Sequence, residues 1–200
     1  MADIPLRPTK AQVAGAANLL VPDVIADMLD VLFVGINPGL YSAAIGYHFG
    51  RPGNRFWPAL HLGGFTPRVL SPWENELLLE ERLGITNVVE RASARAEELA
   101  ADELLAGAAV LADKIDRHAP RVAALLGVTS YRIAFRRPKA TIGLQPEKIG
   151  DTELWVLPNP SGLNAHYQIP DLGRLFAELR THVRPPKEDE PSCPKPRAKS

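Results

Sequence analysis

The sequence predicts an α/β fold in which a parallel sheet is covered by helices on both faces. Two observations favour this fold. Short runs of continuous apolar residues are typical of strands that are buried on both sides, and segments with apolar residues at helical spacing lie near them in the chain. Alternation of such strands and helices is typical of a parallel sheet with helices on its faces.

The predicted strands are three apolar runs, Val31–Gly35, Val122–Leu126 and Leu154–Leu157. Helices are predicted where apolar residues recur at helical spacing, between residues 104 and 115 and again between 172 and 179. The first stripe consists of Leu104, Ala108, Leu111 and Ile115. The second consists of Leu172, Leu175, Phe176 and Leu179.

The length and composition predict a single domain. A chain of 200 residues, 46% of them hydrophobic, can bury one good core but hardly a second. We expect the domain to span residues 1–184, with residues 1–24 as an N-terminal extension. Residues 185–200 combine prolines with mixed charge and lack large apolar side chains, so they predict a disordered tail.

The charge balance and the cysteine count exclude several classes of protein. Lys plus Arg and Asp plus Glu number 23 each, so no excess of positive charge over the whole protein would hold it on nucleic acid. A polyanion must therefore be bound by local contacts. The single Cys193 excludes an intramolecular disulfide, a cysteine-built zinc site and an iron–sulfur cluster. No apolar run has the length of a membrane span and no secretory signal is present, so we expect a cytoplasmic protein with no membrane partner.

Two similar loops follow two of the predicted strands. VLFVGINPGL and ELWVLPNPSGL are both apolar runs that end in Asn-Pro, with a glycine and a leucine close behind. In an open α/β sheet the ligand crevice lies at the carboxyl ends of the strands. We therefore expect both loops to open onto one cleft that holds the functional site.

Common catalytic motifs are absent from this cleft. GINPG has neither the GxGxxG spacing of dinucleotide sites nor the lysine of a phosphate-binding GxxxxGK[ST] loop. No GxSxG nucleophile motif occurs, and the five histidines lack metal-binding spacing, so no metal is expected.

Asn37 is the polar side chain at the tip of the first loop. Its amide can accept and donate hydrogen bonds but cannot exchange a proton at neutral pH, so it can position a nucleophile without activating it strongly. A turn before Gly39 is the commoner use of an asparagine in such a loop. Downstream, GYHFGRPGNRFW places Phe49 on a glycine-rich scaffold suited to stacking on a base, while Phe56 and Trp57 are expected to begin a packed helix.

GINPGL, GYHFGRPGNRFW and LPNPSGLN, in this order, resemble the mismatch-specific uracil and thymine DNA glycosylases, a branch of the uracil-DNA glycosylase superfamily. The similarity runs from about residue 31 to about residue 179 and includes GITNVVERAS in the middle. The resemblance implies a three-layer α/β/α sandwich around a short, mainly parallel sheet. It also implies excision of uracil or related bases mispaired with guanine, without a cofactor.

The resemblance also assigns roles within the base pocket. Asn37 corresponds to the asparagine that positions the attacking water, and Phe49 to the aromatic residue that stacks on the extruded base. Backbone groups around Ile36 and Phe49 would bind the polar edge of the base, and Ser42 matches a small polar pocket position. Asn159 stands where many relatives outside this branch carry a histidine, which implies weaker stabilisation of the departing base.

The second loop is implied to act on the duplex. Leu163 corresponds to the wedge that enters the DNA, and Gly162 and Asn164 would face the widowed guanine. His166 and Tyr167 are candidates for contacts with the DNA backbone or ordinary surface residues. Six basic residues are candidate phosphate contacts or ordinary surface charges: Arg51, Arg55, Arg132, Arg136, Arg137 and Lys139.

Asn87 and Glu90, in GITNVVERAS, are further candidates near the cleft. Glu90 would assist the water or widen the substrate range; as an alternative it is a surface helix residue or the partner of Arg91. Together these residues predict a monomeric and monofunctional glycosylase that acts on double-stranded DNA with a G:U mismatch, since no motif position holds a lysine for a lyase step. The alternative is a module that binds mismatched or damaged DNA with little catalysis.

Overall fold

The structure is a computed structural model that describes residues 7–17, 19–162 and 164–185. Its centre is a five-stranded sheet with the order β2-β1-β3-β5-β4. The strands are β1 (Val31–Gly35), β2 (Leu83–Asn87), β3 (Val122–Leu126), β4 (Gly143–Ile149) and β5 (Thr152–Leu157). The first three and β5 run parallel, and β4 pairs antiparallel with β5. The sheet is therefore mainly parallel, as predicted.

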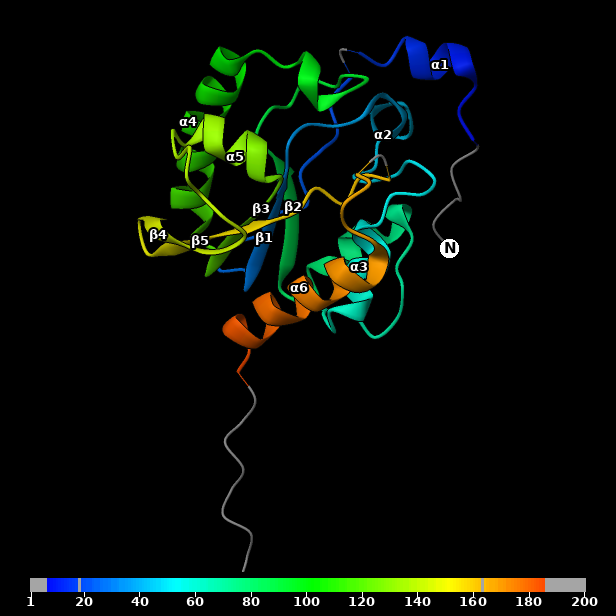
Figure 1. The fold of residues 1–200 in the computed structure, drawn as a ribbon. Coiled ribbons are helices and arrows are strands. Elements are labelled where there is room, and N and C mark those ends of the chain that lie inside the picture. The colour runs from blue at the N-terminus through cyan, green and yellow to red at the C-terminus, as the bar shows by residue number, and fades with distance from the viewer. Residues whose placement is uncertain (1–6, 18, 163, 186–200) are drawn as a thin grey trace, which may run out of the picture.

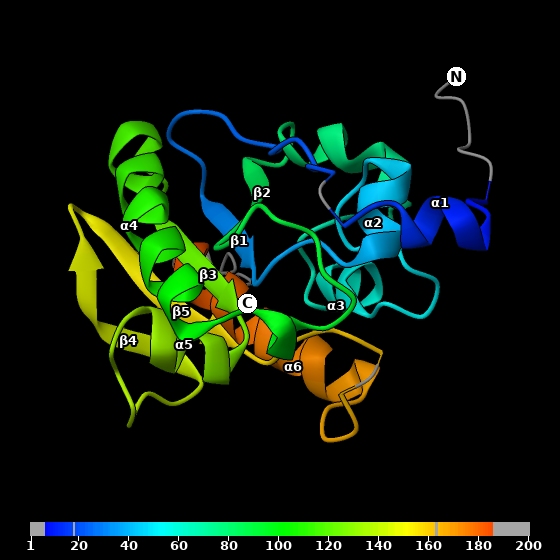
Figure 2. The same ribbon diagram turned by 90° about the horizontal axis from the view of Figure 1, so that it is seen from above.

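Helices cover both faces of this sheet. Those before β3 are α1 (Lys10–Ala14), α2 (Leu40–Ile45), α3 (Phe56–Leu62), the 3-10 helices η1 (Pro72–Leu78) and η2 (Ala96–Glu98), and α4 (Ala101–His118). The later ones are α5 (Val128–Ala134) and α6 (Ile169–Val183). The helices α4 and α5 lie on one side of the sheet, and α3 and α6 lie on the other (Figures 1 and 2). The three-layer α/β/α architecture is confirmed.

The strand β1 explains why the buried strands are continuously apolar. All five of its residues are buried, because successive side chains enter different layers. Phe33 points into the α3/α6 layer, where its ring stacks on Phe176 at a centroid distance of 5.6 Å. Leu32 and Val34 join the cluster beneath α4 and α5.

The strands β1 and β3 have the predicted bounds, and β5 begins two residues earlier than predicted. The strands β2 and β4 were not predicted. β2 reads LGITN, in which a glycine and two polar residues interrupt the apolar pattern, yet every residue is buried. A Cβ atom at Gly84 would lie 2.6 Å from the carbonyl oxygen of Val24, so the glycine admits the N-terminal segment against the strand. β4 is an edge strand with alternating burial and lacks a continuous apolar run.

The described part of the predicted N-terminal extension packs on the domain. Ala16 and Val21 are buried against Ala43 of α2 and Ala92. Val24 forms an isolated antiparallel bridge with Ile85 of β2. The predicted tail lies outside the described residues from residue 186 onward.

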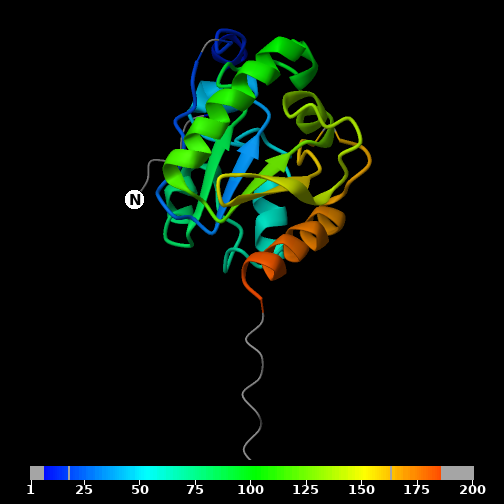
Figure 3. The same ribbon diagram turned by 90° about the vertical axis from the view of Figure 1, so that its left-hand side faces the viewer.

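The parallel strands bring the polar loops to one edge of the sheet. The arrows of β1, β2 and β3 point the same way (Figure 3), and β5 is parallel to β3. Asn37 follows β1, Asn87 ends β2, and Asn159 follows β5. Three asparagines therefore lie at the carboxyl edge, where the sequence predicts a cleft.

Candidate active site

The loop that carries Asn37 is fixed by the segment that follows β2. Beyond the last paired residues of β1 and β2, the amides of Val88 and Val89 donate to the carbonyl oxygens of Gly35 and Ile36, both at 2.9 Å. Further on, the Ser93 amide donates to the carbonyl oxygen of Pro38 at 3.1 Å. The chain on both sides of Asn37 is thus paired, which limits the freedom of its backbone.

The side chain of Asn37 is held by the same segment. Its Nδ2 donates to the carbonyl oxygen of Arg91 at 2.9 Å and to Oγ of Ser93 at 2.8 Å. The hydroxyl of Ser93 in turn donates to the carbonyl oxygen of Arg95 at 2.7 Å, so it can only accept from Asn37. Both amide hydrogens are used, and no donor among the described residues contacts Oδ1. The arrangement fixes the amide orientation and leaves Oδ1 as an acceptor.

Phe49 lies on a strained turn after α2. Its backbone φ angle is +52°, a left-handed conformation that is uncommon for a bulky residue and persists only where neighbouring contacts hold it. One such contact is the stacking of its ring on Phe56, with centroids 4.2 Å apart and planes 24° apart. Another is the bond from the Gly50 amide to Oγ of Ser42 at 3.0 Å. Ser42 is buried and holds the turn that carries Phe49.

Asn87 and His48 form a buried pair behind Phe49. The Nε2 of His48 lies 2.9 Å from the carbonyl oxygen of Pro22, which can only accept, so Nε2 carries the proton. Nδ1 is then the acceptor for Nδ2 of Asn87 at 3.3 Å. A Cβ atom at Gly35 would lie 2.4 Å from Oδ1 of Asn87 and 3.3 Å from the Phe49 ring, so these groups share one small space.

Burial keeps His48 neutral. Desolvation lowers the pKa of its imidazole from the ordinary value of 6.5, against the opposing effects of the Pro22 carbonyl and Asp23. The positive charge of Lys114 lowers the pKa further. A neutral imidazole preserves the acceptor at Nδ1, which is what orients the amide of Asn87.

The loop after β5 is shaped by internal bonds. The carbonyl oxygen of the Asn159 side chain accepts from the Ser161 amide at 3.0 Å, and the Asn159 backbone oxygen accepts from Nδ2 of Asn164 at 3.0 Å. Oδ1 of Asn164 accepts from the His166 amide at 3.1 Å. Gly162 is exposed at the surface, and the predicted wedge Leu163 lies outside the described residues.

The remaining predicted residues lie in several places. The side chain of Ile36 points toward Gly127, just after β3, and its backbone carbonyl oxygen accepts from the Val89 amide. The side chain of Glu90 is 62% exposed and lies 3.8 Å from Nζ of Lys114. Pairing of Glu90 with Arg91 is wrong, because Arg91 forms its ion pair with Glu103. The ring of Tyr167 packs partly against the α3/α6 core, and His166 is exposed.

The candidate phosphate contacts differ in what they bind. Arg137 pairs with Glu147, and Arg132 donates to the carbonyl oxygen of Ala140. Arg51 is exposed beside the Phe49 turn. Arg55 uses its guanidinium on the loop after β5.

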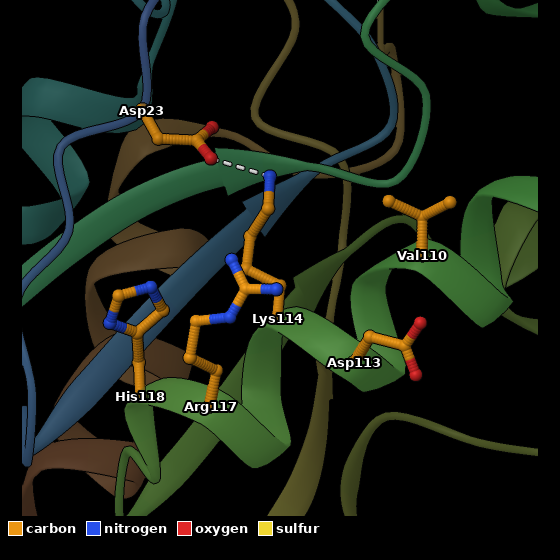
Figure 4. A pocket seen from close by; sticks show the side chains of 6 residues that line it. All are labelled: Asp23, Val110, Asp113, Lys114, Arg117 and His118. Carbon is orange, nitrogen blue, oxygen red and sulfur yellow. Dashed lines mark hydrogen bonds and ion pairs between the residues drawn. The ribbon is translucent and has the colours of Figure 1, made fainter.

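Two cavities among the described residues are not lined by Asn37. One of about 470 Å³ adjoins the Phe49 turn and is lined in part by Tyr41, Arg51 and Trp73. The other, of about 290 Å³, lies over α4 (Figure 4). There Nζ of Lys114 points at Asp23 and pairs with it at 2.5 Å. The charged groups of the α4 cavity are thus partly engaged with one another.

Sequence reasoning missed the residues that support the site. Ser93 and the Arg91 carbonyl hold Asn37, and His48 orients Asn87. Arg91 and Ser93 lie in GITNVVERAS and His48 lies in GYHFGRPGNRFW, and these motifs were the only sequence signal for them. Among the described residues, no cluster of three His, Cys, Asp or Glu side chains could hold a metal ion. Likewise, none of the described helices is both long and apolar enough for a membrane span.

Comparison with known proteins identifies the family of the chain and a similar fold. The model of the uracil DNA glycosylase superfamily matches residues 22–180, which include all three edge asparagines. The fold matches a solution NMR structure of a "putative Uracil DNA glycosylase" from Methanosarcina acetivorans, with a TM-score of 0.55 and 20% identity over 83% of this chain and 98% of that chain.

The chain belongs to the uracil DNA glycosylase superfamily. Its class is that of DNA repair glycosylases, and its fold is the one typical of that class.

Proposed function

We propose that the protein is a monofunctional glycosylase that hydrolyses uracil mispaired with guanine in double-stranded DNA and leaves an abasic site. The observation that carries the proposal is the amide of Asn37, whose two hydrogens are bound and whose Oδ1 is left as an acceptor. An oriented acceptor at the carboxyl edge of the sheet suits a water molecule that must be aimed at a sugar carbon.

Hydrolysis of the glycosidic bond requires few groups besides the positioned water. Water attacks C1′ of the deoxyribose, the bond from C1′ to N1 of uracil breaks, the electron pair leaves with the base, and the uracil anion takes up the proton that the water loses. The transition state resembles an oxocarbenium ion, as in sugar hydrolysis. Because uracil leaves as a fairly stable anion, a positioned water and hydrogen bonds to the base suffice, and no cofactor is required.

Phe49 and Asn87 are the proposed base pocket, together with the backbone of Ile36 and with Ser42 as support of the Phe49 turn. The ring of Phe49 is partly buried, with one side packed on Phe56, and its other side would stack on the flipped base. The amide of Asn87 offers one acceptor and one remaining donor hydrogen, which match the N3–H and O4 of uracil. The amino group and N3 of cytosine would present the opposite pattern.

The loop after β5 is proposed to open the duplex. A base must leave the stack before an enzyme can reach its glycosidic bond, at a cost of a few kcal/mol that is lowest for a mismatch. Leu163 would act as the apolar wedge. Gly162 and the second amide hydrogen of Asn164 would face the guanine, and Asn159 would donate to the departing base. Glu90 is proposed only as an accessory group, because its side chain is largely exposed.

The test is single-turnover cleavage of labelled duplexes that contain U:G, U:A, T:G or C:G pairs, with and without alkaline strand scission. We expect cleavage at U:G that appears only after alkali, because a monofunctional enzyme leaves the strand intact. Asn37→Ala should lower the rate by about a hundredfold, because the water is no longer positioned. Binding of the U:G duplex should be retained by this variant, as measured by fluorescence anisotropy.

Each other outcome has a distinct meaning. Absence of cleavage in the unmodified protein, together with tight mismatch binding, would support the binding-module alternative instead. Equal cleavage by Asn37→Ala would remove Asn37 from the mechanism. Equal rates on U:G and U:A would contradict mismatch specificity. A monomeric state and a cytoplasmic location remain predictions.

A further inference from the structure

Arg55 lies at the junction of the two loops that the proposed reaction needs. Nη1 of its guanidinium donates to the carbonyl oxygens of Asn164, at 2.7 Å, and Tyr167, and Nη2 donates to that of Gly162 at 3.2 Å. The backbone amide of Arg55 donates to the carbonyl oxygen of Pro160 at 2.9 Å. One residue therefore binds four carbonyl groups of the loop after β5.

The bonded carbonyls flank the predicted wedge position. Gly162 and Asn164 stand directly before and after residue 163, and Pro160 and Tyr167 lie farther out on each side. The bonds to Arg55 therefore fix the described residues on both sides of that position. We propose that Arg55 is a positioning residue that holds residues 160–162 and 164–167 where they can act on the duplex; this rests on the proposed function.

An arginine is suited to this task. Its planar guanidinium presents several N–H groups in a fixed fork, so it can bind separate carbonyls at once. Hydrogen bonds to a charged donor are also stronger than neutral ones. A lysine amine in the same place could reach one or two of the carbonyls but could not reproduce the fork.

The same residue links the wedge loop to the base-stacking turn. Arg55 directly precedes α3, whose first residue Phe56 stacks on Phe49 at 4.2 Å. A Cβ atom at Gly162 would lie 2.7 Å from the carbonyl oxygen of Gly53, so the two loops also touch near Arg55. Opening of the duplex and capture of the base would then depend on one connected unit.

The test compares two duplexes that differ only in whether the base must be extruded from a pair. In one, uracil lies opposite guanine; in the other, it lies opposite an abasic analogue, where no pair resists flipping. We expect Arg55→Ala to lower the single-turnover rate on the U:G duplex by more than about tenfold and the rate on the second duplex far less. Arg55→Lys should give an intermediate loss on U:G.

Arg121→Ala is the matched control. Arg121 also donates to a backbone carbonyl, that of Val183 at 2.6 Å, but it precedes β3 at the opposite edge of the sheet. Its variant should cleave both duplexes like the unmodified protein. Thermal unfolding of both alanine variants would identify an effect on the fold.

An independent readout is the fluorescence of 2-aminopurine placed beside the uracil, which rises when the neighbouring base leaves the stack. Arg55→Ala should lose this rise on U:G while it still binds the duplex. Equal losses on both duplexes, or no loss on either, would overturn the proposal. Cleavage by the unmodified protein tests the proposed function separately, because the role of Arg55 is measured as a ratio between two duplexes.

Discussion

The two Asn-Pro loops at the carboxyl edge share a sequence pattern but use their asparagines in opposite ways. Asn37 donates both amide hydrogens to the segment after β2, and its Oδ1 receives no bond from the described residues. Asn159 accepts at Oδ1 from Ser161, inside its own loop. The first asparagine is held from outside and keeps an acceptor, whereas the second completes its own turn.

The difference arises from the neighbouring strands. β1 lies between β2 and β3, so its loop runs beside the continuation of β2, which supplies the Arg91 carbonyl and Ser93. β5 lies between β3 and the antiparallel β4, which leads away from this edge. The loop after β5 is held instead by Arg55, from the other layer. The hydrogen bonds of each Asn-Pro loop therefore depend on the segment that lies beside it.

Apart from Arg55, the largest effect among the supporting residues is expected at Ser93. Ser93→Ala removes one of the two acceptors for the Asn37 amide, so the side chain can rotate away from the water position. We expect the single-turnover rate on U:G to fall about fivefold, from the loss of one part-buried hydrogen bond of roughly 1 kcal/mol. DNA affinity should be unchanged.

Ser130→Ala, which removes a hydroxyl from α5, serves as the control for Ser93→Ala. An unchanged rate for Ser93→Ala would mean that the Arg91 carbonyl alone orients Asn37.

A smaller effect is expected at Asn159, and two variants separate its two uses. Asn159→Ala removes both the turn acceptor and the amide donor, and we expect a loss of about threefold in the rate on U:G. Asn159→Asp keeps an acceptor for the Ser161 amide but places a negative charge where the base departs as an anion. It should therefore lose more activity than Asn159→Ala, measured by single-turnover cleavage.

Full activity of Asn159→Asp would contradict a donor role for Asn159. The residue would then act only through the turn.

The smallest effect at neutral pH is expected in the free energy of unfolding. It concerns His48, the partner of the third asparagine of this edge, Asn87. Burial lowers the pKa of His48 below 6.5, so the folded protein favours the neutral imidazole. This contribution to stability is fully present above pH 6.5 and is lost as the pH falls from 6.5 through the lower pKa of the folded state. His48→Gln, which does not titrate, should flatten this part of the curve.

The measurement is the free energy of unfolding from urea titrations between about pH 5 and 8, for the unmodified protein and His48→Gln. The difference between the two curves cancels the other titrating groups. Parallel curves would mean that His48 does not become charged on unfolding in this range.

Much of the fold could be predicted because its signals are local. Continuous apolar runs identified β1 and β3 with their observed bounds, and stripes at helical spacing identified α4 and α6. β2 was not predicted, because its burial depends on Gly84, which makes room for Val24 and Leu29 from a distant part of the chain. β4 was not predicted, because an edge strand needs no continuous apolar run.

The sequence by itself determined that Asn37 follows a buried strand and that a similar loop occurs later in the chain. Parallel strand order then brought both loops to one edge, as expected. Only the tertiary structure decided which groups hold each asparagine, because Ser93 lies 56 residues from Asn37 and the Asn164 carbonyl lies 109 residues from Arg55. Hydrogen bonds over such separations depend on how the layers pack, and no local pattern of residues records them.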